Sequence, residues 1–188
     1  MQEQYSDDDS VSRSLTLEDP LGPNLDDVQV TPTSFSFSDG MNILKFSYLK
    51  NFEFVLNLSD DEEITGLDLN HSGGTMGLGE RAHHYLLAHL ARLRAQHVSE
   101  GYRAMVQGWI SNKQIARDMG TDMSHINIMI YRARRQLQEA IPHLMDGENL
   151  VERKRGRLRL GVECFSVYKS GECIARLPLK KSKSAKCS

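Results

Sequence analysis

The sequence has few cysteines, and none of them has the spacing of a metal site or a disulfide framework. The three cysteines are Cys164, Cys173 and Cys187, an odd number without a CxxC motif or a paired Cys/His pattern. A structural zinc site and a disulfide-stabilised scaffold are therefore not expected. Reduced thiols are typical of a cytoplasmic protein, and this is the compartment that we expect.

Long apolar runs are also missing. No stretch approaches the ~20 apolar residues of a membrane-spanning helix. The N-terminal segment MQEQYSDDDS does not have the composition of a signal peptide. We therefore expect a protein without a membrane partner.

Catalytic motifs are absent as well. The sequence contains no GxSxG motif, no nucleophile–base pair, no metal triad and no HExxH pattern around His83, His84 and His89. The glycine-rich segment from His71 to Gly79 lacks the GK[ST] ending of a phosphate-binding loop, and we interpret it as a connector. The sequence thus predicts no enzyme, no cofactor and no metal site.

Basic residues are scarce in the first part of the chain. Residues 1–70 hold 15 acidic and 3 basic side chains, a net charge of −12, whereas residues 71–188 hold 10 acidic and 20 basic side chains, a net charge of +10. All seven histidines also lie in the second part. This division favours an anion-binding domain behind an acidic arm, although the formal net charge of the whole chain is only −2.

Composition and periodicity divide the 188 residues into four segments. Residues 1–32 are rich in Ser and Asp and are predicted to be a disordered or loosely attached arm, which either covers the basic half or simply solubilises the chain. Residues 33–70 alternate apolar and polar side chains between turn residues, which predicts three or four short antiparallel strands. Residues 71–161 form the helical and basic part. Residues 162–188 are interpreted as an additional hairpin, turning at Ser170-Gly171, and a basic tail.

An amphipathic helix is expected from Glu80 to about Val98. Its proposed apolar face consists of Ala82, Leu86, Leu90 and Leu93. The histidines of this helix are interpreted as solvated or packed side chains rather than ligands.

A second, shorter helix is expected from Asn112 to about Met119. Ser111 is a suitable N-cap, and Gln114, three residues later, completes the pattern of a capping box. Gly120 follows the helix and favours the left-handed conformation that ends it.

A third helix is expected over residues 123–140, capped by Thr121 or Asp122. Its apolar residues recur at helical spacing: Ile126, Ile130, Ala133 and Leu137. A short helix, a glycine turn and a second helix packed across it form a helix-turn-helix, whose second helix can lie in the major groove of DNA. Taken alone, the pair is equally compatible with a helical hairpin in some other α-rich domain.

The side of the third helix opposite its apolar stripe carries the candidate DNA-binding residues. Arg132, Arg135 and Tyr131 are expected to contact phosphates or bases. The residues near the helix start are expected to reach base edges, and Ile128 is expected to meet a thymine methyl group. The candidates on this helix are Ser124, His125, Asn127, Ile128, Tyr131, Arg132 and Arg135.

A basic hairpin is expected over residues 150–160, LVERKRGRLRL. Its apolar residues Leu150, Val151, Leu158 and Leu160 alternate around a turn at Arg155-Gly156. A hairpin with apolar roots and a basic tip has the form of a wing, and its tip can follow the phosphate backbone or enter the minor groove. The expected contacts are Arg153, Lys154, Arg155 and Arg157. A basic surface hairpin without function is the alternative.

These elements, in their order along the chain, resemble the winged-helix effector domain of bacterial response regulators of the OmpR/PhoB type. In that family the recognition helix often reads V-D-V-H-I-R-R-L-R-K-K-L, and residues 126–137 here read INIMIYRARRQL. The similarity places Ile126, Ile130 and Leu137 toward the core and Arg132, Arg134 and Arg135 toward solvent. It implies an α+β winged helix-turn-helix: a three-helix core with a small N-terminal antiparallel sheet and a C-terminal wing hairpin. The sequence departs from the family because no receiver-domain pattern precedes the sheet.

The expected function is that of a bacterial or phage transcription regulator that binds double-stranded DNA, for which a homodimer is a compatible arrangement. An alternative is a winged-helix adaptor that docks RNA polymerase or another regulator, which outward-facing Ile128 and Tyr131 would favour. RNA binding through an RRM-like sheet is not indicated, because no aromatic-bearing sheet motif is present.

Overall fold

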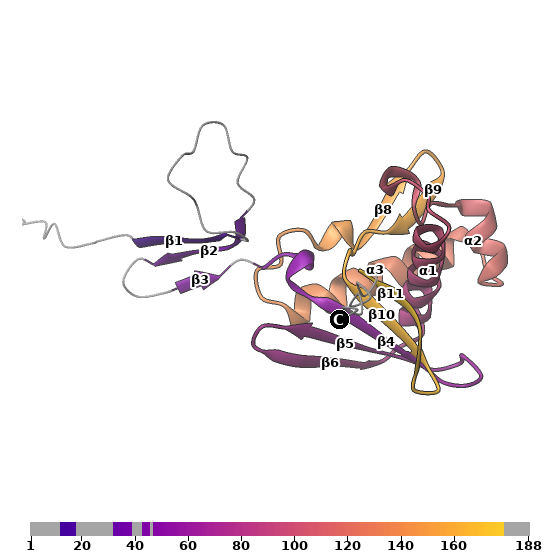
Figure 1. The fold of residues 1–188 in the computed structure, drawn as a ribbon, viewed down its shortest axis with the longest axis horizontal. Helices are drawn as coiled ribbons and strands as arrows, with labels where there is room; N and C mark the ends of the chain where they lie inside the picture. Colours follow the sequence, from indigo (N-terminus) through magenta and orange to yellow (C-terminus); the bar gives the residue numbers. More distant parts are fainter. Residues whose placement is uncertain (1–11, 18–31, 39–42, 46, 179–188) are drawn as a thin grey trace, which may run out of the picture.

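The computed structural model describes residues 12–17, 32–38, 43–45 and 47–178. These residues form an α+β fold with three α-helices and three sheets (Figure 1). The helices are α1 (Ala82–Ser99), α2 (Asn112–Asp118) and α3 (Met123–Ala140). Short 3-10 turns lie at η1 (Leu49–Asn51), η2 (Ala104–Val106) and η3 (Gly147–Leu150). The α+β class and the three predicted helices are confirmed.

The first sheet is antiparallel and contains β1 (Ser12–Leu17), β2 (Pro32–Ser38) and β3 (Ile43–Lys45), in that spatial order. Within residues 1–32, predicted to be a disordered or loosely attached arm, Ser12–Leu17 forms β1 and pairs with β2. Residues 1–11 and 18–31 of the predicted arm lie outside the described residues, and so do the basic tail after residue 178 and Cys187.

The second sheet has five strands in the order β11-β10-β4-β5-β6. Its strands are β4 (Glu53–Leu58), β5 (Thr65–His71), β6 (Gly74–Glu80), β10 (Phe165–Lys169) and β11 (Glu172–Leu177). The predicted hairpin after residue 161 is confirmed as β10–β11. It is not a peripheral addition, because β10 pairs in parallel with β4 and so lies inside the sheet that begins in the N-terminal half.

The interpretation of residues 71–79 as a connector is wrong, because Gly74–Glu80 forms β6 and pairs with β5. Met76 and Leu78, which stand between the glycines, pack against the core. Glycine weakens a strand and hides its alternation in the sequence. As an edge strand, β6 needs partners on only one side, so its low strand propensity is tolerated.

Helix α1 lies between the five-stranded sheet, α3 and the hairpin strand β9 (Figure 1). Leu86 and Leu90 are buried as predicted, but Ala82 is exposed, and Glu80 belongs to β6 rather than to the helix. Because several elements surround this helix, His83, His84 and Arg94 are also buried. A single apolar face therefore does not describe α1.

The third sheet is built from β7 (Ile110–Ser111), β8 (Val151–Lys154) and β9 (Arg157–Leu160), in the order β7-β9-β8. Arg94 of α1 holds the base of the hairpin β8–β9 by donating hydrogen bonds to the carbonyls of Leu160 (2.9 Å) and Val162 (2.8 Å). Gly161 allows the close approach of this segment to η3, since a Cβ there would lie 1.8 Å from the carbonyl oxygen of Asn149. The hairpin β8–β9 is thus fixed to the helical core at its base.

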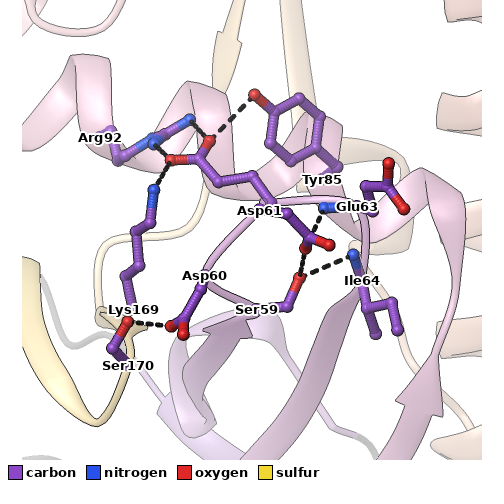
Figure 2. Close-up of polar contacts among 10 residues, drawn as sticks. Ser59, Asp60, Asp61, Glu63, Ile64, Tyr85, Arg92, Lys169 and Ser170 are labelled. Atoms are coloured by element: carbon purple, nitrogen blue, oxygen red, sulfur yellow. Dashed lines mark hydrogen bonds and ion pairs between the residues drawn. The ribbon is translucent and has the colours of Figure 1, made fainter.

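The carboxylate of Glu62 joins three parts of the fold. In Figure 2, Arg92, Lys169 and Tyr85 surround this carboxylate, which carries no label there. Glu62, in the loop between β4 and β5, accepts two hydrogen bonds of 3.0 Å from Arg92 of α1. Lys169 of β10 (2.8 Å) and the Tyr85 hydroxyl (3.1 Å) complete the group. Hydrogen bonds from Arg92 and Lys169 lower the pKa of Glu62 to about 2.

Candidate nucleic-acid interface

Helices α2 and α3 are positioned by the caps that the sequence predicts. The Ser111 hydroxyl accepts a hydrogen bond from the amide of Gln114 (3.1 Å), and the Asp122 carboxylate accepts one from the amide of His125 (2.9 Å). Gly120 between the helices has a φ of 60°, a left-handed conformation that glycine adopts without a steric penalty. The capping box is only half formed, because the side chain of Gln114 donates to Asp118 instead of to the amide of Ser111.

The apolar stripe of α3 faces the core as predicted. Ile126, Ile130, Ala133 and Leu137 are all buried, and Met129 joins them. Burial of these side chains determines which side of α3 remains in water, since residues three or four apart share a face.

The opposite side of α3 is open to solvent over its whole length. All seven candidates predicted on it are exposed: Ser124, His125, Asn127, Ile128, Tyr131, Arg132 and Arg135. Tyr131 keeps 63% and Ile128 46% of its accessible surface. The two side chains are three residues apart on the helix, so they share one face and form a small exposed apolar patch.

Two arginines of α3 are engaged within the protein. Arg135 forms an ion pair with Glu139 (2.7 Å), which raises the pKa of Arg135. Arg134, expected on the solvent side, turns inward instead, and its guanidinium donates to the carbonyls of Val151 (2.8 Å) and Glu148. Burial, and then the charge of nearby Arg153, lower the pKa of Arg134. Arg134 therefore braces the start of β8 and is withdrawn from the exposed face.

Hydrogen bonds of Gln136 connect α3 to α1 and to β6. Gln136 accepts hydrogen bonds from His83 and His84 of α1 through one oxygen (2.8 Å each), and its amide nitrogen donates to the Leu78 carbonyl of β6 (2.7 Å). The second ring nitrogen of His84 lies 3.2 Å from the Thr65 carbonyl. Burial lowers the pKa of both histidines. The orientation of α3 is thus tied to α1 and to the sheet by buried polar groups.

The hairpin β8–β9 has the predicted buried roots and basic tip. Leu150, Val151, Leu158 and Leu160 are buried, while Arg153, Lys154, Arg155 and Arg157 are exposed. Arg155 and Gly156 have φ values of 46° and 73°, as a tight two-residue hairpin turn requires. Lys154 pairs with Arg157 across the strands, so both side chains leave the same face of the hairpin.

Three contacts bring α2, α3 and the hairpin turn to one end of the domain. Arg153 of β8 donates a hydrogen bond to the side-chain oxygen of Asn127 of α3. The first amide of α2, that of Asn112, donates to the Gly156 carbonyl in the hairpin turn (2.9 Å). Ser111, immediately before α2, pairs with Arg157 of β9. The start of α3 therefore lies beside the hairpin, with Arg153 next to Asn127, and the start of α2 contacts the hairpin turn.

The structure adds two basic residues that the sequence analysis did not single out. Lys113 and Arg117 of α2 are exposed and stand four residues apart, so they project from one side of the helix. They line an open groove of about 490 Å³ together with Thr121 and Met123 at the start of α3. Their i, i+4 spacing on a predicted helix is the sequence feature that would have identified them.

No group of three or more metal-ligating side chains occurs among the described residues. Within the same residues, no helix combines the length and apolar character needed to cross a membrane. No family model matches the chain, and neither a curated protein nor a solved structure is significantly similar to it.

Proposed function

We propose that the chain is a winged helix-turn-helix protein that binds double-stranded DNA and regulates transcription. In this proposal α3 enters the major groove, and the hairpin β8–β9 follows the backbone or enters the minor groove. The single observation that supports it most is the hydrogen bond between Arg153 and Asn127, because it places the basic hairpin beside the exposed face of α3.

The side chains on this surface suit a division between backbone and base contacts. Arg132, Lys113 and Arg117 and the basic residues of the hairpin turn supply positive charge for phosphates, which sets position and affinity without sequence preference. Ser124, His125 and Asn127 offer polar groups near the start of α3, where recognition helices reach base edges. Ile128 offers an apolar surface for a thymine methyl group.

The proposal is tested by the salt dependence of binding to a labelled duplex, measured by fluorescence anisotropy. Protein that neutralises phosphates releases counterions, so the affinity should fall steeply between about 50 and 200 mM salt. For six phosphate contacts the expected loss is roughly a thousandfold. Absence of binding at low salt, or an affinity that does not change with salt, would contradict the proposal.

A second candidate function, docking of another protein, is favoured by the loop between α1 and β7. Met105 keeps 77% of its accessible surface there, with Tyr102 and Val106 exposed beside it. The loop is held in one shape, because Arg159 donates to the Ala104 carbonyl (3.2 Å) and packs over the ring of Trp109 at 4.8 Å. An ordered apolar protrusion of this kind is typical of a protein contact. DNA binding that is lost on Arg132→Ala but kept on Met105→Ala would place the apolar loop outside the DNA-binding surface.

A further inference from the structure

Strand β8 is hydrogen-bonded to one side of α3 at two positions along the helix, Asn127 and Arg134. Asn127 and Arg134 are seven residues apart, which is two helical turns and about 10 Å along the same flank. Arg134 holds the Val151 carbonyl, and Asn127 accepts a hydrogen bond from Arg153, two residues further along β8. The Arg153 guanidinium is therefore fixed beside the exposed face of α3 in the free protein.

Arg153 reaches α3 because its side chain lies on the inward face of the hairpin. Its cross-strand partner is Leu158, which is buried, and cross-strand partners point to the same face. Val151, two residues earlier on that face, is buried as well. Arg153 is thus the last residue of the inward face of β8, whereas Lys154 and Arg157 leave the outward face.

The contact determines the orientation of the Asn127 amide. A guanidinium has only N–H donors, so the group of Asn127 that faces it must be the oxygen. The amide nitrogen then points away from Arg153, on a residue that is exposed. Arg153 is exposed too, and its remaining N–H groups are donors. Together the two side chains present mainly donors to an approaching ligand, because Arg153 already occupies one of the two lone pairs of the amide oxygen.

The bases differ in the hydrogen-bond donors and acceptors that they present to Asn127 and Arg153 in the major groove. Adenine presents one acceptor and one donor in the major groove, so the usual bidentate contact from asparagine needs both its oxygen and its nitrogen. Guanine presents two acceptors, N7 and O6. We infer that Asn127 and Arg153 act as one unit that selects guanine where α3 meets the hairpin. This inference rests on the proposed DNA-binding function and names a determinant of its sequence preference.

The experiment is a selection of bound duplexes from a random pool by the full chain and by three variants. The wild-type protein should prefer guanine at one position by roughly 5- to 150-fold, the range of a good bidentate contact. Arg153→Ala frees the amide oxygen, so the preference at that position should move toward adenine. Asn127→Ala should lose most of the preference. Because both side chains are exposed, thermal melts should show that the variants remain folded.

Lys154→Ala is the matched control, since Lys154 is the neighbouring basic residue on the other face of the hairpin. It should weaken binding evenly and leave the selected sequence unchanged, as loss of a phosphate contact does. If Arg153→Ala and Asn127→Ala select the wild-type sequence with lower affinity, the two residues are phosphate contacts and the inference is overturned. If the wild-type protein enriches no sequence at all, sequence-specific regulation itself fails, and the inference fails with it.

Discussion

Single side chains in this protein join segments that are distant in the sequence, and Glu62 is the most heavily bonded of those described. Its carboxylate links the loop after β4 to Arg92 of α1 and to Lys169 of β10. Three partners on one partly buried carboxylate stabilise its charged form, which is why the pKa of Glu62 falls from 4.5 to about 2. A carboxyl group whose pKa is lower in the folded than in the unfolded state stabilises the fold above its unfolded value.

Replacing Glu62 should therefore destabilise the protein in a pH-dependent way. At neutral pH we expect Glu62→Gln to lower the free energy of unfolding by about 2–3 kcal/mol, measured by urea denaturation. This difference between the wild-type protein and the variant should shrink as the pH falls from 4.5 to about 2. Glu63→Gln, at the exposed neighbouring position, is the control and should change stability by less than about 0.5 kcal/mol. An equal effect of both substitutions would contradict the assigned role of Glu62.

At the scale of elements, the helices and the hairpin are predictable from local chemistry. Ser111, Gly120 and Asp122 specify the caps and the turn, and the pattern of Ile126 and Leu137 specifies the buried side of α3. The features that were missed depend on neighbours distant in the sequence. Strand β6 is identified only by its pairing with β5, and β10 enters the sheet only through β4.

The candidate interface shows the same division between local and distant determinants. Periodicity identified the exposed face of α3 and the basic tip of the hairpin. It did not show that Arg134 turns inward or that Arg153 meets Asn127, because both outcomes depend on how β8 docks along α3. Local patterns therefore predict which faces are exposed, while tertiary packing determines which exposed groups remain available.

The attachment of α3 through Gln136 should make the protein sensitive to mild acid. His83 and His84 are buried, and burial lowers their pKa values from 6.5. The charge of Arg81 also disfavours protonation of both, and that of Arg132 disfavours protonation of His83. A histidine with a lowered pKa in the folded state costs stability when the pH falls below its unfolded value. We expect the free energy of unfolding to decrease from about pH 8 to about pH 5.5, above the range in which Glu62 acts.

This prediction is tested by urea denaturation across the pH range. The readout is the difference in the free energy of unfolding between about pH 8 and about pH 5.5. His84→Leu should reduce the difference even if it changes stability at high pH, because it removes one buried proton-binding group. His125→Leu is the control on the exposed face of α3 and should keep the wild-type difference. An unchanged pH dependence in His84→Leu would show that His84 is not its cause.

At the scale of the whole molecule, the five-stranded sheet pairs a strand from the end of the described chain, β10, with β4. Of the last two described strands, β10 lies next to β4 from the first half of the chain, and β11 pairs with β10 at the edge of the sheet. In the sequence, α1, α2, α3 and the hairpin β8–β9 all come between β4 and β10. Phe165 and Val167 of β10 are fully buried in the shared core. The candidate interface and the sheet are thus parts of one folded unit rather than separable pieces.

Mutations in β10 should consequently destabilise the entire domain. Phe165→Ala removes a large buried side chain and should cost about 3–5 kcal/mol. Ile174→Ala, on the exposed part of β11, should cost less than about 0.5 kcal/mol. Urea denaturation followed by both circular dichroism and the fluorescence of Trp109 should show one coincident transition, shifted in Phe165→Ala. Two separate transitions would indicate that the sheet and the helical part unfold independently.

The most direct test of the proposed function is the DNA affinity of variants on the exposed face of α3, measured by fluorescence anisotropy. Arg132→Ala should weaken binding evenly across sequences and reduce the salt slope by about 1, as loss of a phosphate contact does. Arg135→Ala should weaken binding less, because Arg135 must first leave Glu139. Lys50→Ala is the control, since Lys50 belongs to η1, whose Leu49 amide donates to Asp146 (2.8 Å) in the segment after the C-terminal end of α3. Wild-type affinity in Lys50→Ala with reduced affinity in the arginine variants is the predicted result. Wild-type affinity in both arginine variants would contradict the account.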